Sequence, residues 1–149
     1  MVNEIEIPTT FPDAGDVRDK RVVITGAGRG LGRLLAHGFS SAGARVALVS
    51  RTEADLEAVA DELPGESMAL AGDASDEVFV EGVADEVLRA WGGLDCWIAN
   101  AGISPVVASA RDTPAQVWRD VLEVNLTGAF LGARAASRVM RGRGRIIFT

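Results

Sequence analysis

The residues that first point to chemistry are glycines in the segment RVVITGAGRGLGRLLAHGF, between Arg21 and Phe39. They stand at every second position, as Gly26, Gly28, Gly30 and Gly32. They follow a short apolar run and open a segment with helical spacing, so they are expected where a strand turns into a helix. Glycine permits a sharp turn there, and the free N–H groups and dipole of a helix N-terminus attract anions. The segment predicts a site for a diphosphate; a tight turn without a ligand is the alternative.

The elements that must position these glycines follow from the apolar pattern. From Arg21 onward, short apolar runs alternate with longer segments of helical spacing, which is typical of βαβ units around a parallel sheet. Strands are expected at residues 21–25, 45–50, 67–73 and 94–100, and a fifth begins at Arg145. Helices are expected between them, the last extending to Met140 with a bend near residues 125–128. The predicted fold class is α/β, a doubly wound sheet with helices on both faces.

Side chains of the first helix and the fourth strand carry simpler expectations. The buried face of that helix is predicted from six residues at helical spacing: Leu31, Leu34, Leu35, Gly38, Phe39 and Ala42. His37 lies off this stripe and is expected in solvent. Cys96 is expected to behave as a small buried apolar residue.

Composition limits the partners. The 149 residues suit one domain over residues 20–149, and residues 1–19, with Pro8, Pro12 and several acids, are expected to form a flexible extension. The net charge of −6, without a basic cluster before Arg134, argues against nucleic acid as a ligand. The one cysteine, Cys96, makes neither an internal disulfide nor a metal cluster, so no metal is predicted. Without a signal segment or a long apolar run, the sequence predicts a cytoplasmic protein that does not contact membranes.

The spacing of the glycines resembles one particular family. The general dinucleotide fingerprint G-x-G-x-x-G is not matched, because its third glycine would fall on Leu31. The segment instead has T-G-x-x-x-G-x-G, and this is similar to the cofactor motif of the short-chain dehydrogenase/reductase family. Three further stretches resemble that family in the same order: Asp73 with Ala74, ANAG at 99–102, and VNLTG at 124–128. In the second of these, Ala99 replaces the family's first asparagine.

The resemblance implies a Rossmann-type sheet with strand order 3-2-1-4-5 in three α/β/α layers, incomplete within this chain. It also implies site residues: Asn125 in a catalytic role, and cofactor contacts from Thr25, Gly26, Gly28, Arg29, Gly30, Leu31, Gly32, Ser50, Arg51, Asp73, Ala74, Asn100, Ala101 and Gly102. Asp73 would contact adenine, although a helix cap is an alternative role. Asn100 and Asn125 are also compatible with purely structural hydrogen bonding.

The end of the second strand bears on which nicotinamide cofactor is used. A carboxylate there accepts hydrogen bonds from a ribose 2′-hydroxyl, whereas arginine neutralises a 2′-phosphate. Ser50 and Arg51 occupy this place, and Arg29 of the glycine loop can approach from the other side. This pair of arginines resembles the NADP-preferring members of the family, so NADP is predicted. Glu53 lies close enough in sequence to keep NAD as an alternative.

The family's reaction needs groups that these residues do not provide. The resemblance implies hydride transfer between nicotinamide and an alcohol or carbonyl substrate, with a Tyr-x-x-x-Lys pair and a serine for the proton chemistry. The sequence contains no tyrosine, and its only lysine is Lys20. Catalysis is therefore expected to need residues beyond Thr149, in a longer enzyme that forms a homo-oligomer. Two alternatives remain: a dinucleotide-binding module or inactive fragment without catalysis, and another Rossmann-like enzyme such as a methyltransferase.

Overall fold

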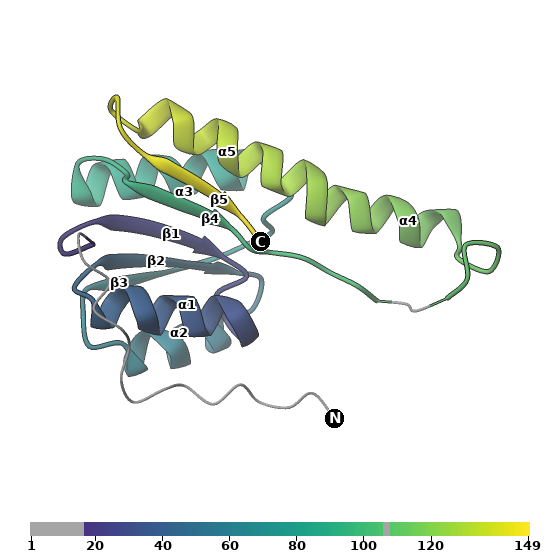
Figure 1. Cartoon of the computed structure of the whole chain (residues 1–149), viewed down its shortest axis with the longest axis horizontal. Coiled ribbons are helices and arrows are strands. Elements are labelled where there is room, and N and C mark those ends of the chain that lie inside the picture. Colours follow the sequence, from purple (N-terminus) through teal and green to yellow (C-terminus); the bar gives the residue numbers. More distant parts are fainter. Residues whose placement is uncertain (1–16, 106–107) are drawn as a thin grey trace.

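Five parallel strands form one sheet in the order β3-β2-β1-β4-β5, as expected (Figure 1). The computed structural model describes residues 17–105 and 108–149. The strands are β1 (Arg21–Thr25), β2 (Arg45–Ser50), β3 (Ser67–Ala71), β4 (Cys96–Ala99) and β5 (Arg145–Phe148). The helices are α1 (Gly30–Ser41), α2 (Glu53–Glu62), α3 (Glu77–Trp91), α4 (Ala115–Leu122), the π-helix η1 (Glu123–Thr127) and α5 (Gly128–Val139). Most of the extension predicted for residues 1–19 lies outside the described residues.

Both faces of the sheet are covered, which gives the three predicted layers. Successive residues of a strand point to opposite faces. Val22 and Ile24 of β1 accordingly belong to the apolar core under α1 and α2, whereas Val23 belongs to the core under α3 and α5. Figure 1 shows these two helix pairs on either side of the sheet. Strands β1 and β2 have the predicted bounds, while β3 and β4 are shorter than predicted.

Helix α1 does not bury the face that the leucines predict. Gly32, Ala36 and Ser40 are buried, whereas Leu31 is 47% exposed; Leu35 and Phe39 are partly buried against the same core. These three small residues recur every four positions, so they form one stripe along the helix. This stripe is the inner face of the helix. Small residues, rather than large ones, mark the inner face here.

His37 is buried rather than solvated, which corrects the prediction. Its Nε2 lies 2.9 Å from Oε2 of Glu62 at the end of α2, and Arg33 contacts the same carboxylate. Partial desolvation raises the pKa of Glu62, but the hydrogen bonds with Arg33 and His37 outweigh it and hold this pKa below the usual value. The three side chains link α1 to α2.

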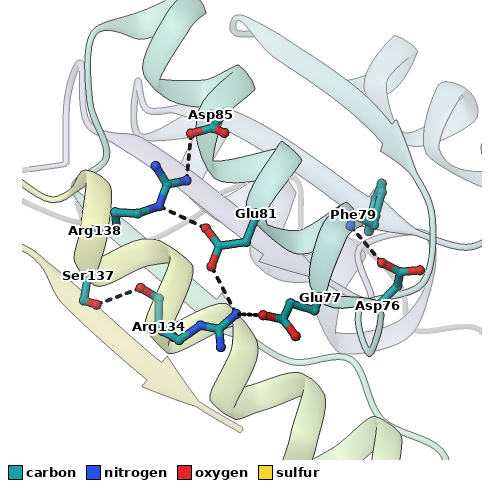
Figure 2. Close-up of polar contacts among 8 residues, drawn as sticks. All are labelled: Asp76, Glu77, Phe79, Glu81, Asp85, Arg134, Ser137 and Arg138. Atoms are coloured by element: carbon teal, nitrogen blue, oxygen red, sulfur yellow. Dashed lines mark hydrogen bonds and ion pairs between the residues drawn. The ribbon is translucent and has the colours of Figure 1, made fainter.

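The opposite helix pair is joined by a row of ion pairs (Figure 2). Arg134 of α5 contacts Glu77 at 2.6 Å and Glu81 at 3.3 Å, both on α3. Arg138, one turn further along α5, contacts Glu81 at 2.9 Å and Asp85 at 2.7 Å. The acids recur every four residues on α3 and the arginines every four on α5, so each set lies on one helix face. The row links α5 to α3 at the surface, above the apolar core that the two helices share.

Helices α4, η1 and α5 follow one another without a break in the chain and form the long helix that projects past the sheet in Figure 1. The bend predicted near residues 125–128 overlaps the π-helix η1. In α5, Gly132 packs on Trp97 of β4 so closely that a Cβ atom would overlap the indole. None of the helices in the described part of the chain is both long enough and apolar enough to cross a membrane.

Candidate cofactor site

A cleft of about 470 Å³ lies at the carboxyl ends of the strands. Ligands of open parallel sheets bind at this edge, where neighbouring connections leave in opposite directions. The cleft is lined by Gly26, Gly28, Arg29, Gly30, Leu31, Gly32, Ser50, Arg51, Thr52, Asp55, Gly72, Asp73, Ala74, Asn100, Ala101, Gly102, Ile103 and Val124. Every residue predicted to contact the cofactor is among them except Thr25. Segments far apart in the sequence therefore meet at one place.

The glycine loop leads directly into α1 and leaves room for an anion. Gly26 and Gly30 have φ values of +68° and +56°, which side chains rarely tolerate. A Cβ on Gly30 would meet no atom within 4 Å, so this residue borders open space. A Cβ on Gly32 would instead overlap the carbonyl of Gly26. The loop is thus tight on its inner side and open toward the cleft.

The N-terminus of α1 supplies donors to that space. The first N–H groups of a helix have no carbonyl partner within it, and they carry partial positive charge. Arg29 is the N-cap residue, and within the described residues its side chain makes no cap hydrogen bond. The first turn is Gly-Leu-Gly-Arg, without an acid that would compete for these amides. This donor set fits a diphosphate group such as that of a dinucleotide.

Thr25 lies behind the cleft and connects its two sides. Its Oγ1 accepts hydrogen bonds from the N–H groups of Asn100 at 3.0 Å and Ala101 at 2.9 Å. In return, Nδ2 of Asn100 donates to the carbonyl of Thr25 at 2.9 Å. Thr25 is only 4% exposed. These reciprocal bonds fix the glycine loop against the loop that follows β4.

Asp73 stands in the β3–α3 connection, and its carboxylate is held locally. Oδ1 accepts from the backbone N–H of Ser75 at 2.9 Å and from its hydroxyl at 2.7 Å. These two bonds, with a smaller contribution from the charge of Arg51, hold the pKa of Asp73 below its usual value. Asp73 does not cap α3, because Asp76 is the N-cap and accepts from the N–H of Phe79 (Figure 2).

Replacing Ser75 by alanine is expected to raise the pKa of Asp73 part of the way toward the ordinary 3.8, because the hydroxyl bond is lost and the backbone bond remains. A lowered carboxylate pKa adds stability that is present at neutral pH and is lost as the pH falls through the folded-state value. The variant should therefore lose some stability at neutral pH. Carboxyl ¹³C NMR titration measures the shift, and an unchanged Asp73 pKa would contradict the assignment.

Asn125 lies in η1 beside the cleft, and its side chain is occupied by one backbone unit. Its Oδ1 accepts from the N–H of Ile103 at 2.8 Å, and its Nδ2 donates to the carbonyl of Ile103 at 3.1 Å. Val124 lines the cleft directly, and Asn125 does not. The Asn125 side chain thus positions the segment that follows Gly102.

Five cleft residues were not among those predicted from the sequence: Thr52, Asp55, Gly72, Ile103 and Val124. Thr52 and Gly72 immediately adjoin predicted residues. Val124 belongs to the VNLTG segment, so the motif predicted a functional site in this part of the sequence. Asp55 lies in the first turns of α2, and only the packing of that helix brings it to the cleft. Its sequence position carries no signal for this.

Comparison with known proteins agrees with this geometry. A sequence model of the short chain dehydrogenase family matches residues 20–149. L-fucose dehydrogenase of Bos taurus is 37% identical over 129 residues, which cover 86% of this chain and 47% of that protein. 3beta-hydroxysteroid dehydrogenase 1 of Eggerthella lenta is 35% identical over 127 residues, covering 81% and 48% respectively. The chain thus spans about half the length of the curated relatives it matches.

Solved structures show the same fold. A short-chain type dehydrogenase/reductase from Mycobacterium marinum superposes with a TM-score of 0.85 at 35% identity, covering 89% of this chain and 56% of that one. A 3-ketoacyl-ACP reductase from Sinorhizobium meliloti 1021 gives a TM-score of 0.82, also at 35% identity, and covers 86% and 52%.

Proposed function

The chain belongs to the short chain dehydrogenase family. We propose that it binds NADP(H) and that it is the cofactor-binding part of an oxidoreductase acting on an alcohol or carbonyl compound. The observation that carries this proposal is the open, donor-lined space at the start of α1, between Gly30 and the loop after β4. A dinucleotide diphosphate has the charge and size for such a place. The relatives differ in the substrates that their names give, so the proposal stops at this class of compound.

The adenosine end of the cleft supports NADP(H) over NAD(H). Arg29 and Arg51 line it from two different loops, and Ser50 ends β2 where a carboxylate would favour a 2′-hydroxyl. Two guanidinium groups beside a 2′-phosphate would offset its charge. NAD(H) remains the alternative cofactor.

The chemistry divides between the cofactor and groups of the protein. When bound, a nicotinamide dinucleotide supplies a hydride donor or acceptor. In our proposal the glycine loop holds the diphosphate, and Asn125 keeps the segment at Ile103 in place beside the cleft. A proton donor near neutral pH would also be needed. The 149 residues contain no tyrosine, so the Tyr-x-x-x-Lys pair of the family is not available among them.

A dinucleotide-binding module without catalysis is the second candidate, because the open space at the start of α1 supports cofactor binding by itself. Both candidates predict NADPH binding by the 149 residues, and only the enzyme predicts turnover by the whole protein. A panel of alcohols and carbonyl compounds, assayed with the whole protein by nicotinamide absorbance, separates them. Preference for S-adenosylmethionine over NADPH would contradict both and favour a methyltransferase.

Fluorescence titration of the chain with NADPH and NADH tests the cofactor proposal. The wild-type chain is expected to bind NADPH more tightly than NADH. Arg51→Asp should weaken NADPH by about tenfold or more, because an attractive charge beside the 2′-phosphate becomes a repulsive one. The same variant should leave NADH binding nearly unchanged. Equal loss for both cofactors, or no loss for NADPH, would argue against the assignment of Arg51.

For the whole protein we further propose a cytoplasmic homo-oligomer. A single cysteine is consistent with a reducing compartment. Helices α4, η1 and α5 expose Trp118, Leu126 and Phe130, which are 60%, 63% and 59% accessible. Exposed apolar side chains at helical spacing are a common feature of contact surfaces. Light scattering of the purified protein measures the oligomeric state.

A further inference from the structure

A carboxylate that the sequence marked only as the partner of Thr52 in a capping box lies at the adenosine end of the cleft; Thr52, the N-cap of α2, makes no side-chain cap hydrogen bond within the described residues. Asp55 belongs to the beginning of α2 and lines the cleft. A Cβ atom built on Gly28 would lie 3.0 Å from Cβ of Asp55 and 3.1 Å from Oγ of Ser50. Asp55, Gly28 and Ser50 therefore meet at one wall, between the glycine loop and the end of β2. This is the part of the fold that faces the adenosine ribose.

The other acids near this wall are placed differently. Asp73 also lines the cleft, but its carboxylate is held by Ser75. Glu53 lies in the same first turn of α2 as Asp55 and does not line the cleft. Among residues 17–105 and 108–149, Asp55 makes no hydrogen bond or ion pair with another side chain. Its charge is thus available to a ligand.

A carboxylate and an arginine have opposite effects at this place. The carboxylate accepts a hydrogen bond from a 2′-hydroxyl and repels a 2′-phosphate, whereas Arg29 and Arg51 attract the phosphate. The lining of the cleft therefore includes both kinds of group. We infer that Asp55 is a specificity-determining residue, which limits the preference for NADP(H) and allows NAD(H) to bind. This inference rests on the proposed function.

The test is direct binding rather than activity. Asp55→Asn removes the charge and keeps the shape of the side chain. It is expected to raise the affinity for NADPH by about three- to tenfold, and to leave the affinity for NADH unchanged or lower. The difference should shrink at high salt, which screens charges at an exposed site. Glu53→Gln is the matched control: it removes a charge from the same helix turn outside the cleft and should leave the NADPH-to-NADH ratio as in the wild type.

The outcomes separate the two proposals. A shifted ratio in Asp55→Asn alone supports the role of Asp55. An unchanged ratio, or an equal shift in Glu53→Gln, overturns that role and leaves the proposed function intact. Wild-type protein that binds neither cofactor overturns the proposed function and this inference with it. Thermal unfolding of each variant checks the fold. If Asp55→Asn does not fold, Asp55→Ser replaces it and is expected to shift the NADPH-to-NADH affinity ratio in the same direction.

Discussion

Gly32→Ala is expected to weaken NADPH binding by more than tenfold and to lower the free energy of unfolding by about 1–3 kcal/mol. The new Cβ would overlap the carbonyl of Gly26 and lie 2.8 Å from Nδ2 of Asn100. The Gly26 carbonyl is backbone, so the glycine loop itself must shift to make room. Because the same loop borders the proposed diphosphate site, stability and binding should decrease together.

Gly82→Ala is the matched control for this substitution. Gly82 lies within α3, and a Cβ there would meet no atom within 4 Å. Alanine is the better helix former, so the free energy of unfolding of this variant should rise by about 0.5–1 kcal/mol. Its affinity for NADPH should equal that of the wild type. Denaturant unfolding and fluorescence titration measure the two effects. Wild-type stability and affinity in Gly32→Ala would show that the loop is not as tight as described.

Thr25→Val has the second large expected effect. Valine has the shape of threonine without the hydroxyl, so the N–H groups of Asn100 and Ala101 lose an acceptor at a buried position. Leaving such donors unpaired costs about 1–3 kcal/mol. The loop after β4 should also become less well fixed against the glycine loop, which predicts weaker NADPH binding. Thermal unfolding and hydrogen exchange at Ala101 measure these two consequences.

Thr25→Ser separates the hydroxyl from the packing. Serine keeps Oγ and loses only the methyl group, so the two N–H groups retain their acceptor. Exchange protection at Ala101 should therefore return in Thr25→Ser, while some stability is still lost with the methyl group. Equal protection in Thr25→Val and the wild type would contradict the assigned hydrogen bonds.

The sheet was predictable because its strands are short and apolar, and β1, β2 and β4 are buried on both faces. The bounds of β1 and β2 agree with prediction, since charge or glycine limits each run. The inner face of α1 was not predictable from apolar periodicity. There the glycine loop leaves no room for a Cβ at Gly32, Ala36 is fully buried, and Leu31 is exposed. The prediction that His37 is solvated was wrong, because apolar periodicity within α1 does not reveal its contact with Glu62 of α2.

The cleft was predictable where motifs mark it and not where packing alone creates it. The glycines, Asp73 and Asn100 belong to recognisable motifs, and all of them line the cleft. Asp55 reaches it only because α2 starts beside the glycine loop. The sequence motif included Asn125, but the contact of Asn125 with Ile103 depends on how the long helix lies over the loop after β4. Contacts between elements of this kind have no local signature.

The wide turn of η1 makes the long helix sensitive to residue number. In an uninterrupted α-helix, residues three apart share a face. Here Asn125 contacts Ile103 and Gly128 packs on the carbonyl of Ala74, and both of these partners line the cleft. A π-turn holds one residue more than an α-turn, so deleting one residue from η1 would restore regular winding and keep α4 nearly in phase with α5. Such a deletion should therefore alter the contact of Asn125 with Ile103 at the rim of the cleft while the sheet stays intact.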